Sequence, residues 1–242
     1  MQEEKNTQNS SDNIGEKIIK PGSFFSKLDN FWYHYKWHTI ALVLILIVVT
    51  VSTLQMCQRE EYDIHIMYAG DEGISKLAPP DEPEYTKLVT AIKQVCADYD
   101  GNGEVVINLN TLFCPSDTDG FSPDLIQVAE KDREMLGDIM LASNETYLCF
   151  LSESLFLEYD KHSPVKFTDL SGYGEGLEYT KSKRGIYLSS TDFYSLPGMD
   201  ILPEDTVICL RIQSELYKSR DSKKNFENSK KLLDAILSYK EG

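Results

Sequence analysis

The run Asp98-Tyr99-Asp100-Gly101-Asn102-Gly103 has the residue types that bind a hard metal cation. A D-x-D-x-N-G sequence supplies oxygen ligands at loop positions one, three and five and a glycine at position six. The bidentate glutamate that such a loop needs at position twelve is replaced by Leu109. We therefore expect at most a weak calcium site at Asp98, Asp100 and Asn102, and no other cofactor. The alternative is a tight turn, because Asp, Asn and Gly tolerate left-handed backbone.

A second set of candidates is defined by position in the expected fold. Open parallel sheets bind ligands in the crevice outside the carboxyl ends of their strands. We therefore expect ligand-binding residues among the polar residues that follow the expected strands, which are Asp71, Glu72, Asp117, Asp119, Ser152, Glu153, Ser189, Ser190 and Asp192.

Catalytic motifs are missing from the sequence. There is no G-x-S-x-G, no H-E-x-x-H and no phosphate-binding G-x-x-x-x-G-K. Of the four histidines, His34 and His38 lie in an aromatic segment, His65 lies in an expected strand and His162 in an expected loop. We expect a domain that binds without chemistry. The alternative is a cell-envelope hydrolase that uses two carboxyl groups about 5 to 10 Å apart.

The elements that must hold these residues begin with a membrane span. No formal charge lies between Lys36 and Arg59 if His38 is neutral, and Ile40 to Val49 are all apolar. Eighteen helical residues reach about 27 Å, close to the hydrocarbon thickness of a bilayer. We predict that residues 39–57 contact the lipid bilayer within a helical segment over 23–58. A cleaved signal peptide would have a shorter apolar core, and a lipoprotein signal ending at Cys57 would need a small residue at Met56.

The charges beside this span predict its orientation. Lys20, Lys27 and Lys36 precede it, whereas Arg59 is followed by Glu60, Glu61 and Asp63. We expect a single-pass protein of the cell membrane with a disordered cytoplasmic tail over 1–22 and an extracellular domain over 59–242. Residues 60–242 hold 18 basic and 34 acidic residues, a net charge of −16. That balance argues against nucleic acid as a partner.

Strand and helix patterns alternate beyond the span. Ser122-Pro123-Asp124 is typical of a helix start, and Leu125, Leu136 and Met140 mark the expected buried face of that helix. The sequence predicts an α/β fold with a mainly parallel, three-layer sheet behind one N-terminal transmembrane helix. The expected strands are Tyr62–Ala69, Glu104–Phe113, Tyr147–Leu151 and Thr206–Ile212. Cys149 and Cys209 lie in two of them, and we expect buried free thiols; a bridge between them would need neighbouring strands and an oxidising exterior.

Four segments resemble a known family: Phe31–Trp37, Tyr62–Gly70, Asp98–Val106, and Met135–Leu155 followed by Phe167–Leu170. They are similar to clostridial single-pass membrane proteins whose ectodomain is similar to one lobe of type II periplasmic-binding, or extracellular solute-binding, proteins. The resemblance implies a bacterial, membrane-anchored binding or interaction domain whose partner is an extracellular ligand or another membrane protein. Such proteins close two lobes over a solute, and residues 62–242 supply one. A permanent subunit of a membrane complex is a further alternative.

Overall fold

The structure is a computed structural model that describes residues 24–57, 62–74, 83–162, 167–174, 176–213 and 219–240. The tail predicted over residues 1–22 lies outside these ranges. The chain divides into two compact units, residues 1–60 and 61–242, and each is described by itself.

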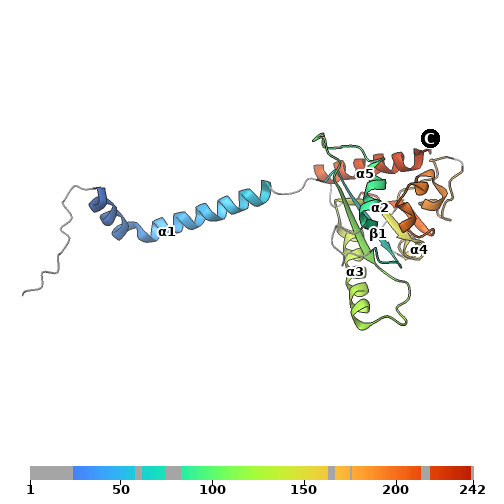
Figure 1. The fold of residues 1–242 in the computed structure, drawn as a ribbon, viewed down its shortest axis with the longest axis horizontal. Helices are drawn as coiled ribbons and strands as arrows, with labels where there is room; N and C mark the ends of the chain where they lie inside the picture. Colours follow the sequence, from blue (N-terminus) through green and yellow to red (C-terminus); the bar gives the residue numbers. More distant parts are fainter. Residues whose placement is uncertain are drawn as a thin grey trace, which may run out of the picture. The chain divides into compact units, whose positions relative to one another are not determined.

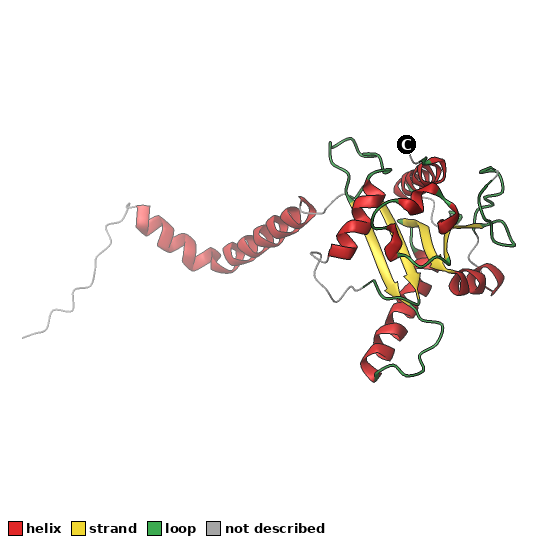
Figure 2. Ribbon diagram, turned by 45° about the vertical axis from the view of Figure 1, so that its right-hand side comes forward, coloured by secondary structure: helices red, strands yellow, loops and turns green. Residues whose placement is uncertain are grey.

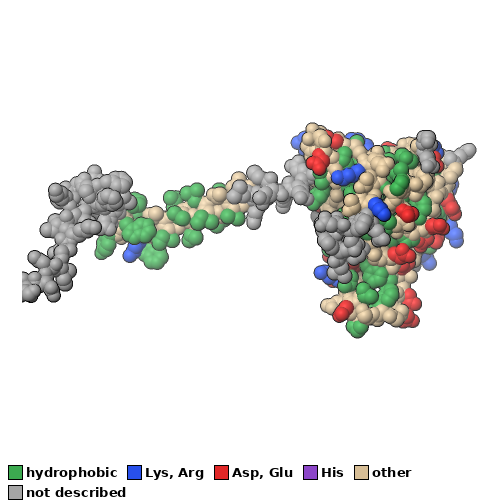
Figure 3. All heavy atoms as spheres, viewed as in Figure 1, with side chains coloured by type: hydrophobic (Ala, Val, Ile, Leu, Met, Phe, Trp, Pro, Cys, Tyr) green, Lys and Arg blue, Asp and Glu red, His purple; other side chains and the backbone are tan. Residues whose placement is uncertain are grey.

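The first unit contains one long helix, α1, over Phe24–Cys57. Its segment Phe31–Thr53 is long and apolar enough to cross a membrane, with a mean hydropathy of 1.8 and no buried residues. Hydrophobic side chains cover this part of α1 (Figure 3). The hydroxyl of Thr50 donates to the carbonyl oxygen of Leu46 at 2.7 Å, so the helix satisfies its own polar group. A single membrane-spanning helix near the N-terminus is consistent with these features.

The second unit is built on one sheet of five strands, in the order β2-β1-β3-β5-β4 (Figure 1). β1 pairs in parallel with both β2 and β3, whereas β5 is antiparallel to its neighbours β3 and β4. Four strands therefore run one way, which confirms the prediction of an α/β fold with a mostly parallel sheet. The strands are β1 Ile64–Gly70, β2 Ile107–Phe113, β3 Thr146–Ser152, β4 Gly185–Tyr187 and β5 Thr206–Leu210.

Helices cover both faces of this sheet (Figure 2). Side chains alternate along β1: Ile66 and Tyr68 pack into one buried cluster, and Met67 and Ala69 into another. The first cluster lies under α2 (Pro83–Lys93), α5 (Arg220–Ser238) and three short 3-10 helices, η1 (Leu188–Ser190), η2 (Asp192–Ser195) and η3 (Met199–Ile201). The second lies under α3 (Pro123–Ala142) and α4 (Glu153–His162). The domain thus has its own core on each face of the sheet.

The start of α3 follows the sequence pattern. The side chain of Ser122 accepts a hydrogen bond from the backbone N–H of Leu125, Pro123 is the first helical residue and Asp124 lies in the first turn. The prediction that Leu125 is buried was wrong, because its side chain is 42% exposed. A helix of 20 residues is about 30 Å long, whereas the seven residues of β2 span about 23 Å. The first turn of α3 therefore extends past the strand that the helix covers.

Two side chains contact the outer edge of β2. Tyr85 of α2 donates its hydroxyl hydrogen to the carbonyl oxygen of Leu109 at 3.2 Å. On the other face, Asp132 of α3 accepts a hydrogen bond from the backbone N–H of Phe113 at 2.8 Å. β4, at the opposite end of the sheet, is only three residues long.

Candidate functional site

The acidic loop over residues 98–103 lies at the amino ends of the parallel strands. Asp98, Asp100 and the buried Asp63 each offer a carboxylate oxygen, and these oxygens lie within 4.8 Å of one another. Asp63 precedes β1, so the site joins a loop and a strand start that are distant in sequence. Leu109, at the position where a calcium loop needs glutamate, is buried in β2 and cannot serve as a ligand.

Backbone N–H groups already bind these carboxylates. Asp63 accepts hydrogen bonds from the N–H groups of Tyr99 at 2.6 Å, Asp100 at 3.1 Å and Val106 at 2.9 Å. The hydrogen bond from the backbone N–H of Gly103 lowers the pKa of Asp98 from its ordinary value. The hydrogen bond from the N–H of Gly101 lowers it further.

Asn102 is also engaged within the loop. Its side-chain NH₂ group donates a hydrogen bond to Asp100, and its side-chain oxygen accepts one from the backbone N–H of Glu104. The loop is therefore a turn held by its own hydrogen bonds. Its carboxylate oxygens are also close enough together to bind a cation.

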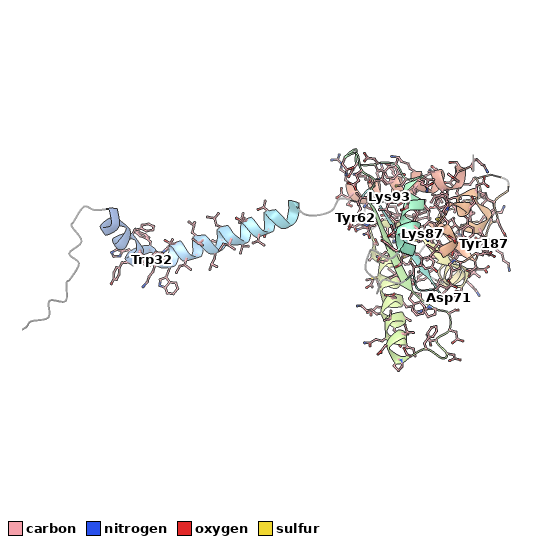
Figure 4. All side chains as sticks on the ribbon, viewed as in Figure 1. Trp32, Tyr62, Asp71, Lys87, Lys93 and Tyr187 are labelled. Carbon is pink, nitrogen blue, oxygen red and sulfur yellow. The ribbon has the colours of Figure 1, made fainter. Side chains whose placement is uncertain are left out.

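The carboxyl ends of the parallel strands lie at the opposite edge of the sheet, which we call the carboxyl edge. The chain leaves β1 toward α2 on one face, and it leaves the neighbouring strand β3 toward α4 on the other face. In α/β folds, ligands commonly bind outside the strand ends where the connections of adjacent parallel strands part in this way. Asp71 and Glu72 follow β1 at this point, and Ser152 and Glu153 lie at the end of β3. Figure 4 labels Asp71 at the end of β1 away from Tyr62 and Lys93.

Several predicted residues at this edge are joined by hydrogen bonds. The backbone N–H of Ser116, which follows β2, donates to Asp71, so the loops after β1 and β2 are in contact. The hydroxyl of Tyr187, the last residue of β4, donates to Glu153. That hydrogen bond raises the pKa of Tyr187 to about 12. Ser152 is buried, with its hydroxyl 3.1 Å from that of Ser154.

The other predicted residues are engaged in local structure. Asp117 accepts from the N–H of Asp119 within its own exposed turn. The hydroxyls of Ser189 and Ser190 donate to the carbonyl oxygens of Glu204 and Tyr187. Asp192 forms an ion pair with Lys240 at 3.1 Å instead of contacting the strand ends.

Two buried hydroxyl groups that sequence reasoning missed lie at the carboxyl edge. Neither the hydroxyl of Tyr68, whose residue is 1% exposed, nor that of Thr206, which is fully buried, has a hydrogen-bond partner in the described part of the chain. Thr206 is the residue of β5 that lies opposite Ser152, so both hydroxyls border the same strand ends. In the sequence these positions fit ordinary strand residues, and nothing in the pattern marks them as functional.

Burial and nearby carboxylates both keep the Tyr68 phenol protonated. Burial raises its pKa well above the ordinary value, and the negative charges of Glu72, Asp205 and Asp71 raise it further. The phenol is therefore protonated at physiological pH and has one hydrogen to donate. We refer below to Tyr68, Asp71, Glu72, Ser152, Asp205 and Thr206 as the carboxyl-edge site.

No protein-family model, curated protein sequence or solved structure matches this chain. The structural conclusion is therefore the fold class: an α/β domain with a five-stranded, mostly parallel sheet, preceded by one helix that is apolar enough to span a membrane.

Proposed function

We propose that this chain is a single-pass membrane protein that presents a non-catalytic binding domain, residues 59–242, outside the cell, with its N-terminus in the cytoplasm. The domain is similar to one lobe of an extracellular solute-binding protein of the type II periplasmic-binding fold. Its ligand binds at the carboxyl-edge site. The observation that carries the proposal is a pair of buried hydroxyls, on Tyr68 and Thr206, that have no hydrogen-bond partner among the described residues and lie where the connections of β1 and β3 part.

Unpartnered hydroxyls support a binding role for an energetic reason. A buried polar group without a hydrogen bond costs about 1 to 3 kcal/mol of stability. Two such groups at the same edge of the sheet, on β1 and β5, are a cost that a ligand can remove by bonding to them. Chemistry has less support. The sequence has no G-x-S-x-G, H-E-x-x-H or G-x-x-x-x-G-K motif.

The binding proposal is tested by ligand-induced stabilisation of the full chain in detergent micelles. Unfolding midpoints are measured with sugars, amino acids, short peptides and amines. A ligand of this site raises the midpoint of the wild type, and the rise shrinks in Thr206→Val, which keeps the side-chain shape but removes a hydroxyl. Asp98→Asn, at the opposite edge, is the control and keeps the full rise. No response to any probe, or a response that Thr206→Val leaves intact, would contradict the proposal.

A further inference from the structure

The hydroxyl of Tyr68 points along β1 toward its carboxyl end. A Cβ atom placed on Gly70 would lie 2.5 Å from the Tyr68 hydroxyl oxygen, so the phenol packs over the backbone of Gly70. The next two residues of the chain are Asp71 and Glu72. The hydroxyl therefore ends beside the acidic residues that follow the strand, and glycine at position 70 leaves the space for it.

A third carboxylate comes from the other side of the site. Asp205 directly precedes Thr206, and Thr206 lies opposite Ser152 where β3 ends. β5 is antiparallel to β3, so its amino end lies at the carboxyl edge of the parallel strands. Asp71, Glu72 and Asp205 all act on the Tyr68 hydroxyl, and no basic side chain is among the charges that act on it in the described structure.

Among the described residues, no ion pair compensates the negative charge at this edge, because none of them includes Asp71, Glu72 or Asp205. Arg133, which lies near the end of β2, is bound to Glu158 at 3.2 Å and to the carbonyl oxygen of Pro115. A cluster of carboxylates with a neutral phenol among them favours a positively charged ligand and repels an anion.

The hydrogen-bonding groups narrow the class of cation. Calcium needs six to eight oxygen ligands, mostly charged or carbonyl, and a protonated phenol is a poor member of such a set. A primary ammonium group has three N–H donors and no acceptor. Carboxylate oxygens can accept two of those hydrogens, and the phenol oxygen of Tyr68 can accept the third.

We propose that the carboxyl-edge site binds organic cations through a primary ammonium group, held by the carboxylates of Asp71, Glu72 and Asp205 and by the buried hydroxyl of Tyr68. This inference rests on the proposed binding function and gives its ligand a chemical class.

The experiment uses the full chain in detergent micelles with putrescine, a diamine, as the probe. Its uncharged counterpart of equal length, 1,4-butanediol, and calcium chloride are the comparison ligands. Putrescine is expected to raise the unfolding midpoint with a saturable dose response that weakens as salt is added, and butanediol is expected to have no effect. Tyr68→Phe should weaken the putrescine response by about tenfold, the size of one hydrogen bond to a charged group. The double variant Glu72→Gln, Asp205→Asn should abolish it.

A matched control separates binding from general attraction to an acidic protein. The double variant Asp117→Asn, Asp119→Asn removes the same charge from the exposed turn after β2 and should keep the full response. An equal loss in both double variants would show non-specific attraction and overturn the inference. Calcium that stabilises the wild type but not Glu72→Gln, Asp205→Asn would make the edge a metal site, which also overturns it. If an uncharged solute stabilises the protein through Thr206 while putrescine has no effect, the ammonium inference fails and the binding function stands.

Discussion

Cys149 and Cys209 lie directly opposite each other on the antiparallel strands β3 and β5, and both are fully buried. The thiol of Cys209 donates to the carbonyl oxygen of Cys149 at 3.7 Å, and the cysteines at positions 96, 114, 149 and 209 are all free. Burial raises the pKa of Cys209 well above the ordinary value, so its reactive thiolate is scarce.

We predict that these four thiols react with a maleimide only after the domain unfolds. The measurement compares the mass of the labelled protein before and after addition of denaturant, without reductant. Cys149→Ala serves as the control and should lower the count in denaturant by one. A peptide in which residues 149 and 209 are joined would contradict the prediction and favour a cross-strand bridge.

Tyr68→Phe should leave the free energy of unfolding unchanged or raise it by about 1 kcal/mol, because it removes a buried hydroxyl that has no hydrogen-bond partner among the described residues. Tyr85→Phe is the matched variant: its hydroxyl bonds to Leu109, and its loss should cost about 1 kcal/mol. Chemical denaturation without added ligand measures both. A larger loss in Tyr68→Phe than in Tyr85→Phe would mean that the Tyr68 hydroxyl is bonded in the native protein.

His65 should make the domain less stable in mild acid. Burial lowers its pKa below the ordinary 6.5, and Glu145 opposes that shift only in part. Its Nδ1 lies 3.0 Å from the side-chain amide of Asn108, which fits a neutral imidazole that accepts the hydrogen bond. His65 therefore takes up a proton more readily in the unfolded chain than in the folded chain. The contribution of neutral His65 to the free energy of unfolding is complete above pH 6.5 and declines as the pH falls below it.

The measurement is the unfolding free energy between pH 8 and pH 5, for wild type and His65→Gln. The variant should show the shallower decline with falling pH. Identical slopes would assign the acid sensitivity to other groups.

Gly198→Ala should destabilise the domain by about 1 to 3 kcal/mol. Gly198 has a φ of +100°, and a Cβ atom there would lie 2.7 Å from the backbone carbonyl carbon of Lys87 in α2. Gly137→Ala is the control, since Gly137 lies inside α3 with open space around it. That substitution should stabilise the protein by about 0.5 to 1 kcal/mol. Thermal unfolding of both variants checks the pair, and equal midpoints would contradict the close contact of η3 with α2.

Calcium at millimolar concentration should raise the unfolding midpoint slightly by binding at Asp98 and Asp100 together with Asp63, whose carboxylate oxygens lie within 4.8 Å of one another. Asp100→Asn should abolish the rise and Asp117→Asn should not, because Asp117 lies in the turn after β2 at the other edge. Addition of a chelator should return the wild type to its starting midpoint. A midpoint that calcium leaves unchanged would identify the loop as a turn without a metal.

Local signals in the sequence predicted the parallel half of the fold. The alternation from β1 to α4 sets the direction of three strands, and Ser122 with Pro123 starts α3 as its residue types dictate. The direction of β5 could not be predicted in the same way. The described residues between α4 and β5, 167–174 and 176–205, form β4 and short 3-10 helices and contain no crossover helix, so no periodic pattern fixes how the chain returns to the sheet.

The candidate sites show a second limit of sequence reasoning. Asp63 follows the span and contributes to its charge asymmetry, yet it is buried and accepts three backbone hydrogen bonds. A tyrosine at position 68 fits a strand whether its side chain is buried or exposed, so the sequence does not predict the burial of its hydroxyl. Whether a polar group inside a strand has a partner depends on residues far away in the chain, and position alone does not carry that information.

The side chains of Tyr85 and Asp132 give the sheet a protection against aggregation. β2 is the long outer strand, and an exposed strand edge is a template on which another molecule can add a strand. Tyr85 occupies the carbonyl oxygen of Leu109, and Asp132 occupies the N–H of Phe113, so an incoming strand would have to displace both. The carboxylate of Asp132 would also bring a negative charge into the new pairing. The domain can therefore carry a seven-residue outer strand without joining its neighbours edge to edge.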